Sequence, residues 1–347
     1  MRYYRLELFE SDAKTPILGV QPLSSHVMTP SGMIANLSAL QVEFDVPITS
    51  LALPQNWPTV KIWGVALQKN GQIPDPTLGY AIGQASDFNG KVLKLDAGFA
   101  NGLPLATNAA QYTRTILQGQ IWQSFGNWID TTQWLEFVVV SNGANFNQQL
   151  NIEWSYTAGT LFSDAITQTF SKALPGYEVI MQISPKLTYS QPLSGSYQSF
   201  TQFSDYIQST TKEIGSTILG PDYQGVQITI LGNRVRVWDG QYATQANPTK
   251  IDFIDLIGQP TWLQPNYVQF TTTMRGDILP GDYVSLPTNK QAQYTTTPQS
   301  LSQYRDTSAF QGTFFIYSAR HVGNFRAPDA LSWVTVFDAY IALPPSA

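Results

Sequence analysis

The sequence has 347 residues, which predicts two or three domains because a single hydrophobic core seldom grows to that size. Charged residues make up only 12% of it and the formal net charge is −5, so the basic surface that binds nucleic-acid phosphates is missing. There is no cysteine, which excludes disulfides and thiolate metal sites.

The low charge predicts an unusually neutral surface on a globular chain, since the apolar content of 43% is ordinary. Such a surface suits a large permanent protein interface, and a monomer with a polar, uncharged skin is the alternative. No apolar run approaches the roughly 18 residues of a membrane helix, and no signal sequence stands at the amino terminus. We therefore expect a soluble protein, made in a cytoplasm, without membrane insertion.

The first part of the chain consists of strand after strand, with turn residues such as Lys69-Asn70-Gly71 between them and no helical period. The expected strands cover residues 2–9, 40–46, 60–67, 91–96, 115–123 and 134–140. Residues 1–158 are therefore expected to form a first β-barrel domain.

From Leu161 the spacing of apolar residues changes to that of a helix. The expected helices cover residues 163–174 and 199–214, and the expected strands 177–184, 226–231 and 234–239. Ser163 caps the first helix, Pro175-Gly176 stops it, and Gly215 ends the second. The last two strands form a hairpin about Gly232-Asn233. Residues 159–245 are thus expected to be a small α/β middle domain.

The last hundred residues predict a second antiparallel barrel, over residues 246–347. Its expected strands cover residues 266–273, 283–286, 312–318 and 333–340. Pro280-Gly281 makes a tight turn that lets the second of these strands pair back on the first. The fold class is therefore mainly β with an α/β insert between two β-barrel domains.

A possible internal repeat links these two β domains. Leu117-Gln-Gly-Gln-Ile121, followed by Gly126-Asn-Trp128, parallels Phe310-Gln-Gly-Thr-Phe314, followed by Gly323-Asn-Phe325. Either the barrels are duplicated, or Gly and Asn recur by chance because both favour turns.

Residues for catalysis are sparse. The chain has two histidines, His26 in a loop rich in Ser, Thr and Pro, where it could be solvated, and His321 at a strand end, where hydrogen bonds would hold it. No G-x-S-x-G turn accompanies them, and no phosphate-binding glycine loop or calcium loop is present. We expect no catalytic residue, no metal and no cofactor, and hence no enzyme.

Three further features have a structural and a functional interpretation. The carboxylate pairs of the last domain could cleave a glycosidic bond, but Asp beside a turn more often binds a backbone amide. These pairs are Asp252 with Asp255, Asp277 with Asp282, and Asp329 with Asp338. Arg275-Gly276-Asp277 spells an integrin-type tripeptide at a strand-to-turn position. The tryptophans at positions 122, 128, 134 and 154 could line a sugar groove, although buried barrel tryptophans are commoner.

Five pieces of the last domain, in order, resemble the closing β-barrel of baseplate hub proteins from contractile-tailed phages. They are Leu256-Ile-Gly-Gln-Pro260, a hydrophobic strand, RGDILPGDYVSLP, FQGTFFIYSARHVGNF and SWVTVFDAY. Upstream, VLKLDAGFA and TILQGQIWQSFGNW resemble the first barrel of that family, and VQITILGNRVRVWDG resembles its middle domain. No lysozyme-like or peptidase segment is fused on, so cell-wall cleavage is not implied.

The resemblance implies a homotrimer whose two barrels per chain make a six-barrel ring between the hexameric tail tube and the trimeric spike. Its partners would be the tube protein, the spike protein and other baseplate proteins, with DNA only in transit through the lumen. The protein would be a structural part of the virion, assembled in the host cytoplasm. A mildly acidic chain fits this passage, because basic residues in the lumen would retain phosphates.

Two other functions stay open at this point. A carbohydrate- or receptor-binding tail protein would use the surface rich in Trp and Tyr, and a glycan hydrolase would use a carboxylate pair.

Overall fold

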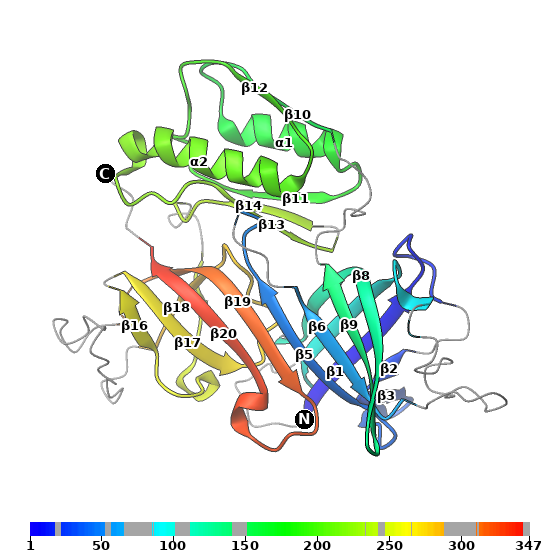
Figure 1. The fold of residues 1–347 in the computed structure, drawn as a ribbon. Helices are drawn as coiled ribbons and strands as arrows, with labels where there is room; N and C mark the ends of the chain where they lie inside the picture. Colours follow the sequence, from blue (N-terminus) through cyan, green and yellow to red (C-terminus); the bar gives the residue numbers. More distant parts are fainter. Residues whose placement is uncertain are drawn as a thin grey trace.

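The structure of the chain is a computed structural model. It describes residues 1–17, 22–52, 57–65, 85, 87–100, 112–140, 151–232, 234–241, 247–264, 266–287, 310 and 312–342. A broad β layer is built from both ends of the chain, and a small domain with both helices lies above it (Figure 1). The fold class is therefore confirmed as mainly β with an α/β insert. No helix among these residues is long and apolar enough to span a membrane.

The amino-terminal part of the β layer contains nine strands. They are β1 (Arg2–Phe9), β2 (Leu23–Ser24), β3 (His26–Thr29), β4 (Gly32–Ala35), β5 (Gln41–Ile48), β6 (Thr59–Trp63), β7 (Val92–Phe99), β8 (Arg114–Ile129) and β9 (Thr132–Val140). The carboxy-terminal part contains β15 (Thr249–Lys250), the 3₁₀ turn η4 (Phe253–Asp255), β16 (Thr261–Gln264), β17 (Tyr267–Thr273), β18 (Tyr283–Ser285), β19 (Phe314–Asn324), η6 (Ala330–Ser332) and β20 (Trp333–Ile341).

Apart from β3 and β4, which pair with each other, these strands form one 13-stranded sheet. Its order is β16-β17-β20-β19-β5-β6-β9-β8-β7-β1-β2, with β18 on β19 and β15 on β18. The sheet contains two modules with the same topology. In the first module the order is β5-β6-β9-β8-β7, and in the second it is β16-β17-β20-β19-β18. We call these sets module 1 and module 2.

Both modules carry a β-bulge at the same place. In module 1, Ile121 faces Val139 and Gln123 faces Val138, so Trp122 is the extra residue. In module 2, Ile316 faces Ala339 and Ser318 faces Asp338, so the extra residue is Tyr317. The bulges align β8 with β19 and β9 with β20, which supports the internal repeat. They also change the alignment of the repeat. The sequence aligned Gly119 with Gly312 and Gly126 with Gly323, whereas the bulges align Gly119 with Phe314 and Gly126 with His321.

The two modules are joined by an antiparallel pair, in which residues 319–324 of β19 face residues 48–43 of β5. Strand alternation places the apolar residues of both strands on the same side of the sheet, where one hydrophobic core runs through both modules. Phe44 of module 1 meets Trp333 of module 2 edge to face in this core, with ring centroids 5.2 Å apart.

The middle part of the chain has a core of its own. It comprises β10 (Ile152–Tyr156), α1 (Phe162–Ala173), β11 (Glu178–Gln182), β12 (Leu193–Tyr197), α2 (Phe200–Leu219), β13 (Gln227–Leu231) and β14 (Arg234–Trp238). The sheet β11-β14-β13 lies between the helices and the β layer, and β10 pairs with β12 (Figure 1). β10 lies inside the range 1–158 but packs in this second core, and the three domain ranges stay predictions.

The middle part is fixed to module 2 by an ion pair and by close backbone approaches. Arg236 of β14 donates to the Asp282 carboxylate at 2.7 Å and to the Pro280 carbonyl at 3.1 Å. A Cβ on Gly281 would overlap the Trp238 ring, so glycine is needed there for space as well as for its positive φ of 92°.

Several expected elements differ in detail. Strand β18 pairs with β19 and β15, so the expected hairpin with β17 is wrong, although Asp282 N does donate to Leu279 O across the Pro280-Gly281 turn. Helix α1 begins after Leu161 without a side-chain cap, so Ser163 lies inside the helix. The expected turn at Lys69-Asn70-Gly71 lies outside the described residues.

Helix α2 starts as expected, because the Ser199 side chain accepts from Gln202 N at 3.2 Å. It does not end at Gly215 but continues to Leu219 and ends at Gly220. A Cβ on Gly215 would overlap the Tyr223 ring. Gly215 therefore allows the Tyr223 ring to pack closely against α2, and it does not end the helix.

Candidate assembly surface

Large apolar side chains are exposed on three segments of the β layer, which we call clusters. They are Val27, Met28, Met33 and Ile34 on the β3–β4 hairpin, Trp122, Phe125, Trp128 and Ile129 on β8, and Phe253, Ile254 and Leu263 around η4 and β16. Single exposed apolar residues are ordinary, whereas clusters of them mark surfaces that contact another protein.

The β3–β4 hairpin was missed by the sequence analysis. Its strands are joined by a two-residue turn, Pro30-Ser31, and Thr29 Oγ1 donates to the Gly32 carbonyl at 2.7 Å. The turn residues between two apolar pairs, Val27-Met28 and Met33-Ile34, were the signal that could have identified it.

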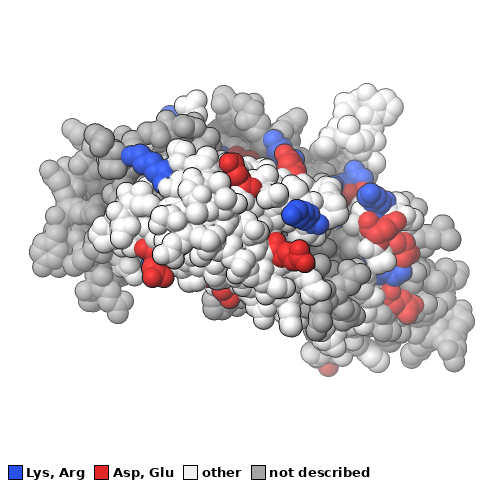
Figure 2. Space-filling view, turned by 90° about the horizontal axis from the view of Figure 1, so that it is seen from above, with Lys and Arg blue, Asp and Glu red and all other residues white. Residues whose placement is uncertain are grey.

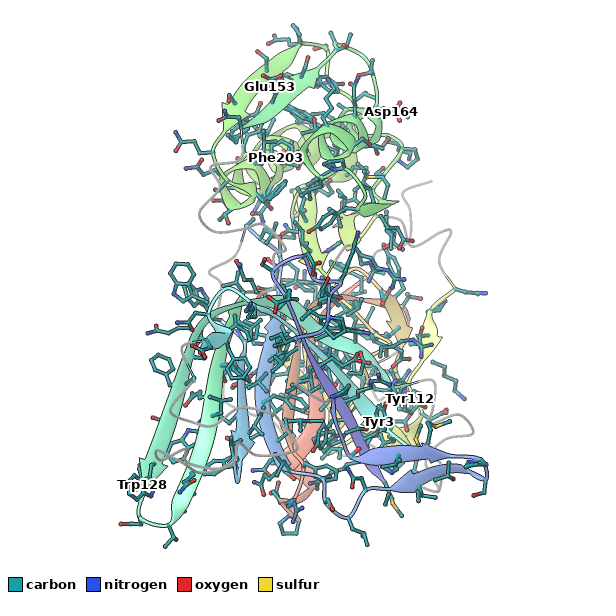
Figure 3. All side chains as sticks on the ribbon, turned by 90° about the vertical axis from the view of Figure 1, so that its right-hand side faces the viewer. Tyr3, Tyr112, Trp128, Glu153, Asp164 and Phe203 are labelled. Atoms are coloured by element: carbon teal, nitrogen blue, oxygen red, sulfur yellow. The ribbon has the colours of Figure 1, made fainter. Side chains whose placement is uncertain are left out.

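The second cluster belongs to an incompletely paired strand. The first half of β8 lies between β7 and β9, but its last residues pair with β9 alone. On the side of β8 that faces β7, the strand pairing stops before Ser124, whose N–H donates to the Asn89 side chain at 2.9 Å. Among the described residues no strand continues beyond that point, and Figure 3 shows Trp128 near the end of the hairpin. An open strand edge with apolar side chains is a site for pairing with another chain.

The third cluster lies around η4 and β16, at one end of the strand order. Strand β16 is terminal in the strand order and pairs with β17 alone among the described strands. Leu263 on this strand is 41% exposed. Within the described part of the chain, each module therefore has a strand edge without a partner strand and with exposed apolar side chains.

Charges on the sheet face opposite the core are largely neutralised by their neighbours. Lys94 lies 3.8 Å from Glu7 and 3.9 Å from Asp96, and Lys61 lies 4.0 Å from Glu136. Exposed pairs like these add little stability. The pairing instead affects the charge of this face. The described part of the face is polar, but it has no concentration of positive charge that would bind phosphates.

The surface above the helices is also poor in charge. Figure 2 shows this side with a few separate acidic and basic side chains among many uncharged ones. The neutral surface expected from composition is thus observed on this side.

Both histidines are buried. His321 lies inside β19, and its Nδ1 is 2.9 Å from Thr335 Oγ1. Burial lowers the pKa of His321 to about 3, so the ring is neutral at ordinary pH. His26 was expected in a solvated loop, but it lies in β3 with Nδ1 2.8 Å from Ser25 Oγ. In the described part of the structure, neither ring is paired with a carboxylate, as a hydrolytic triad would require.

The carboxylate pairs have structural partners. Asp282 accepts from Leu279 N at 2.8 Å as well as from Arg236, which is the turn role expected for it. Asp338 accepts from Gln269 and Ser318 on the adjacent strands. These contacts give Asp282 a role in its turn and Asp338 a role between neighbouring strands.

The integrin-type tripeptide is largely buried. Arg275 is only 2% exposed, and it forms a two-bonded pair with Asp277, with Nε–Oδ1 and Nη2–Oδ2 distances of 2.8 Å. Asp255, which is 0% exposed, lies 3.3 Å from the same guanidinium. The motif is therefore a buried ion cluster in which two of the expected carboxylates, Asp255 and Asp277, share one arginine.

The four tryptophans do not form one groove. Trp154 is buried in the core of the middle part, and Trp128 lies near the hairpin end. Trp122 meets Trp57 edge to face at 5.7 Å, and Trp134 lies 4.9 Å from Trp63. No group of three or more His, Asp or Glu side chains among the described residues is arranged to hold a metal ion.

The chain is thus a mainly β protein with a small α/β insert, two modules of one topology and open apolar edges. No family model matches its sequence, and no curated protein matches it. Solved structures of similar shape include the 43 kDa tail protein of prophage MuSo2 from Shewanella oneidensis, with a TM-score of 0.48, 7% identity and 98% of each chain covered.

Two further structures of similar shape both have a TM-score of 0.44. The E. coli c3393 protein, a component of the type VI secretion system, is 10% identical, over 90% of this chain and 78% of its own. The tail protein from Neisseria meningitidis MC58 is 7% identical, over 97% of this chain and 96% of its own.

Proposed function

We propose that this protein is a structural component of a phage tail baseplate, a homotrimeric hub that joins the hexameric tail tube to the trimeric central spike. It has no chemistry of its own in this role. Its partners are further copies of itself, the tube protein, the spike protein and other baseplate proteins, and DNA passes through the ring without being bound. It would be found in the tail of the virion after assembly in the host cytoplasm.

The duplicated module is the observation that carries this proposal. One chain contains two β modules of the same strand order, with the same bulge, already joined side by side through β5 and β19. Three such chains supply six similar modules, so a threefold assembly can match a sixfold partner on one side and a threefold partner on the other. The resemblance of the last ninety residues to baseplate hub proteins, given above, supports the same role.

The surface suits a permanent assembly. Exposed apolar clusters lie on both modules, and several of the charged side chains on the polar face of the sheet are paired. Interfaces of permanent oligomers are apolar at their centre and poor in charge. We assign the polar face of the sheet to the lumen, because its paired charges would let DNA slide past.

Native mass spectrometry tests the oligomeric state directly. The purified protein is expected at three times the chain mass of 38.5 kDa, and electron micrographs should show a ring with six similar lobes. A monomer, both alone and mixed with tube and spike proteins, would refute the proposal. Specific binding of that monomer to a glycan array would favour the carbohydrate-binding alternative.

A further inference from the structure

The junction inside the chain predicts the contact between chains. We infer that β16 of one copy pairs antiparallel with the distal half of β8 of the next, in the register of the internal β19–β5 pair. This inference rests on the proposed ring, because it names the surface through which a second copy closes that ring.

The module equivalences follow from the strand register. Counting along the strands from the two bulges, Asn127 of β8 corresponds to Val322 of β19. Val138 corresponds in the same way to Asp338. The distal half of β19, residues 319–324, pairs with β5 of module 1. The equivalent half of β8 pairs with β9 on one side, and its other side has no partner strand among the described residues.

The equivalent of β5 in module 2 is β16. Thr59 of β6 faces Val138, and Gln269 of β17 faces Asp338, so Thr59 corresponds to Gln269. Asp45 faces Thr59, and Thr261 faces Gln269. Thr261 of the terminal strand β16 therefore corresponds to Asp45 of β5.

These equivalences fix the intermolecular register. Val322 faces Asp45 within the chain, so Asn127 of one copy is expected to face Thr261 of the next. The same count brings Phe125 to Leu263, the extra residue of a β-bulge in β16. These two side chains are 39% and 41% exposed. Two open edges and two exposed apolar side chains are thus covered by one contact. A second copy is the occupant, because only this chain supplies both halves of the junction it already contains.

The hydrogen-bonding phase of the predicted pair also follows. Within the chain, Phe325 N donates to Val42 O, so the even-numbered residues of β5 direct their amides toward β19. Asp45 and Val322 therefore form a non-hydrogen-bonded pair. The equivalent residues Asn127 and Thr261 would have Cα atoms about 4.5 Å apart, within the range that a disulfide bridges.

A disulfide tests the register without background, because the natural chain has no cysteine. The variant Asn127→Cys/Thr261→Cys carries both halves of the contact on each copy. Mild oxidation is expected to give a covalently closed trimer on non-reducing gels and in mass spectra. The control Phe125→Cys/Thr261→Cys, shifted by two residues on the same face, is expected to form at least tenfold less.

The outcomes separate this inference from the proposed function. If the native protein is trimeric but the Asn127/Thr261 pair links no faster than the shifted pair, the register is wrong while the hub proposal stands. If the native protein is monomeric in every mixture, both fail. Thermal unfolding of the reduced variants, compared with the natural protein, verifies that each is folded before oxidation.

Discussion

The guanidinium of Arg275 lies over the ring of Tyr112, 3.8 Å from its centre. Tyr112 stands just before β8 in module 1, whereas Arg275 follows β17 in module 2. The Tyr112 hydroxyl donates to Asp255 at 3.0 Å, and Gly276 N donates to the Tyr112 carbonyl at 2.9 Å. The two modules are thus held together by a buried ion cluster as well as by the β5–β19 pair.

Replacing Arg275 should strongly destabilise the protein. In Arg275→Met the Asp255 carboxylate stays buried without its cation, which costs about 3–5 kcal/mol of the free energy of unfolding. Urea unfolding measures this loss. The matched control is Arg234→Met, because Arg234 and Glu178 form an exposed pair, with side chains 61% and 58% accessible, and its loss should cost less than about 1 kcal/mol. Equal effects of the two substitutions would contradict the role given to the cluster.

The composition of this cluster could not be predicted from sequence. Arg275 and Asp277 are two residues apart, so their pairing was within reach of local reasoning. Asp255 lies 20 residues before Arg275 in the carboxy-terminal part of the chain. Tyr112 lies in the amino-terminal part, and it meets Arg275 only because the two modules form one sheet. Asp255 and Asp277 were both candidate carboxylates, but the arginine that pairs with both of them in the structure was not predicted.

Gly323 allows the two modules to pack closely at the β5–β19 pair. A Cβ on Gly323 of β19 would overlap the ring of Phe44 on β5, which is 2% exposed and held against Trp333. Because the buried ring has no room to move, Gly323→Ala should destabilise the protein by about 1–3 kcal/mol. A double-mutant cycle with Phe44→Leu checks the cause. The two changes should be non-additive, with the double variant more stable than the sum of the single effects, and simple additivity would exclude the steric explanation.

The periodicity of apolar residues predicted most strands, because alternation along a strand is a local property. Strand lengths were less predictable. Residues 124–129 of β8 lack strict alternation, since that half of the strand is paired on one side only. The pairing of β18 was mispredicted for a different reason. The Pro280-Gly281 turn has the geometry of a hairpin turn, but the chain leaving it is directed to β19 by contacts with Trp238 and Phe315, which lie far away in sequence.

Acid should weaken the β layer through His321. Its pKa is lowered to about 3 by burial, whereas the unfolded chain takes up the proton near 6.5. The stabilisation is therefore complete above pH 6.5 and is lost as the pH falls toward 3, by about 2 kcal/mol at pH 5. Hydrogen exchange of the β19 and β20 amides, corrected for its intrinsic pH dependence, measures this loss. In His321→Gln the acid-induced loss of stability should be smaller. An unchanged loss would show that another group causes it.

The middle part should respond to pH in the opposite direction. Burial raises the pKa of Asp239 to about 6, although this carboxylate accepts from Ser184 N at 2.8 Å, Gln241 N at 2.9 Å and the Tyr223 hydroxyl at 3.2 Å. The folded state therefore binds the proton more tightly than the unfolded chain. This stabilisation is complete below pH 3.8 and is lost as the pH rises through 6, by up to about 3 kcal/mol.

The same hydrogen-exchange experiment tests this second group on the amides of α2, β13 and β14. Between pH 4 and 7 their protection should fall in the natural protein and stay more nearly constant in Asp239→Asn, where no proton can be lost. The variant itself is expected to be less stable at low pH, because its amide nitrogen cannot accept a hydrogen bond from a backbone N–H. Since His321 and Asp239 lie in different cores, each substitution should change the pH dependence of its own core. A shared change in both sets of amides would mean that the β layer and the middle part unfold as one cooperative unit.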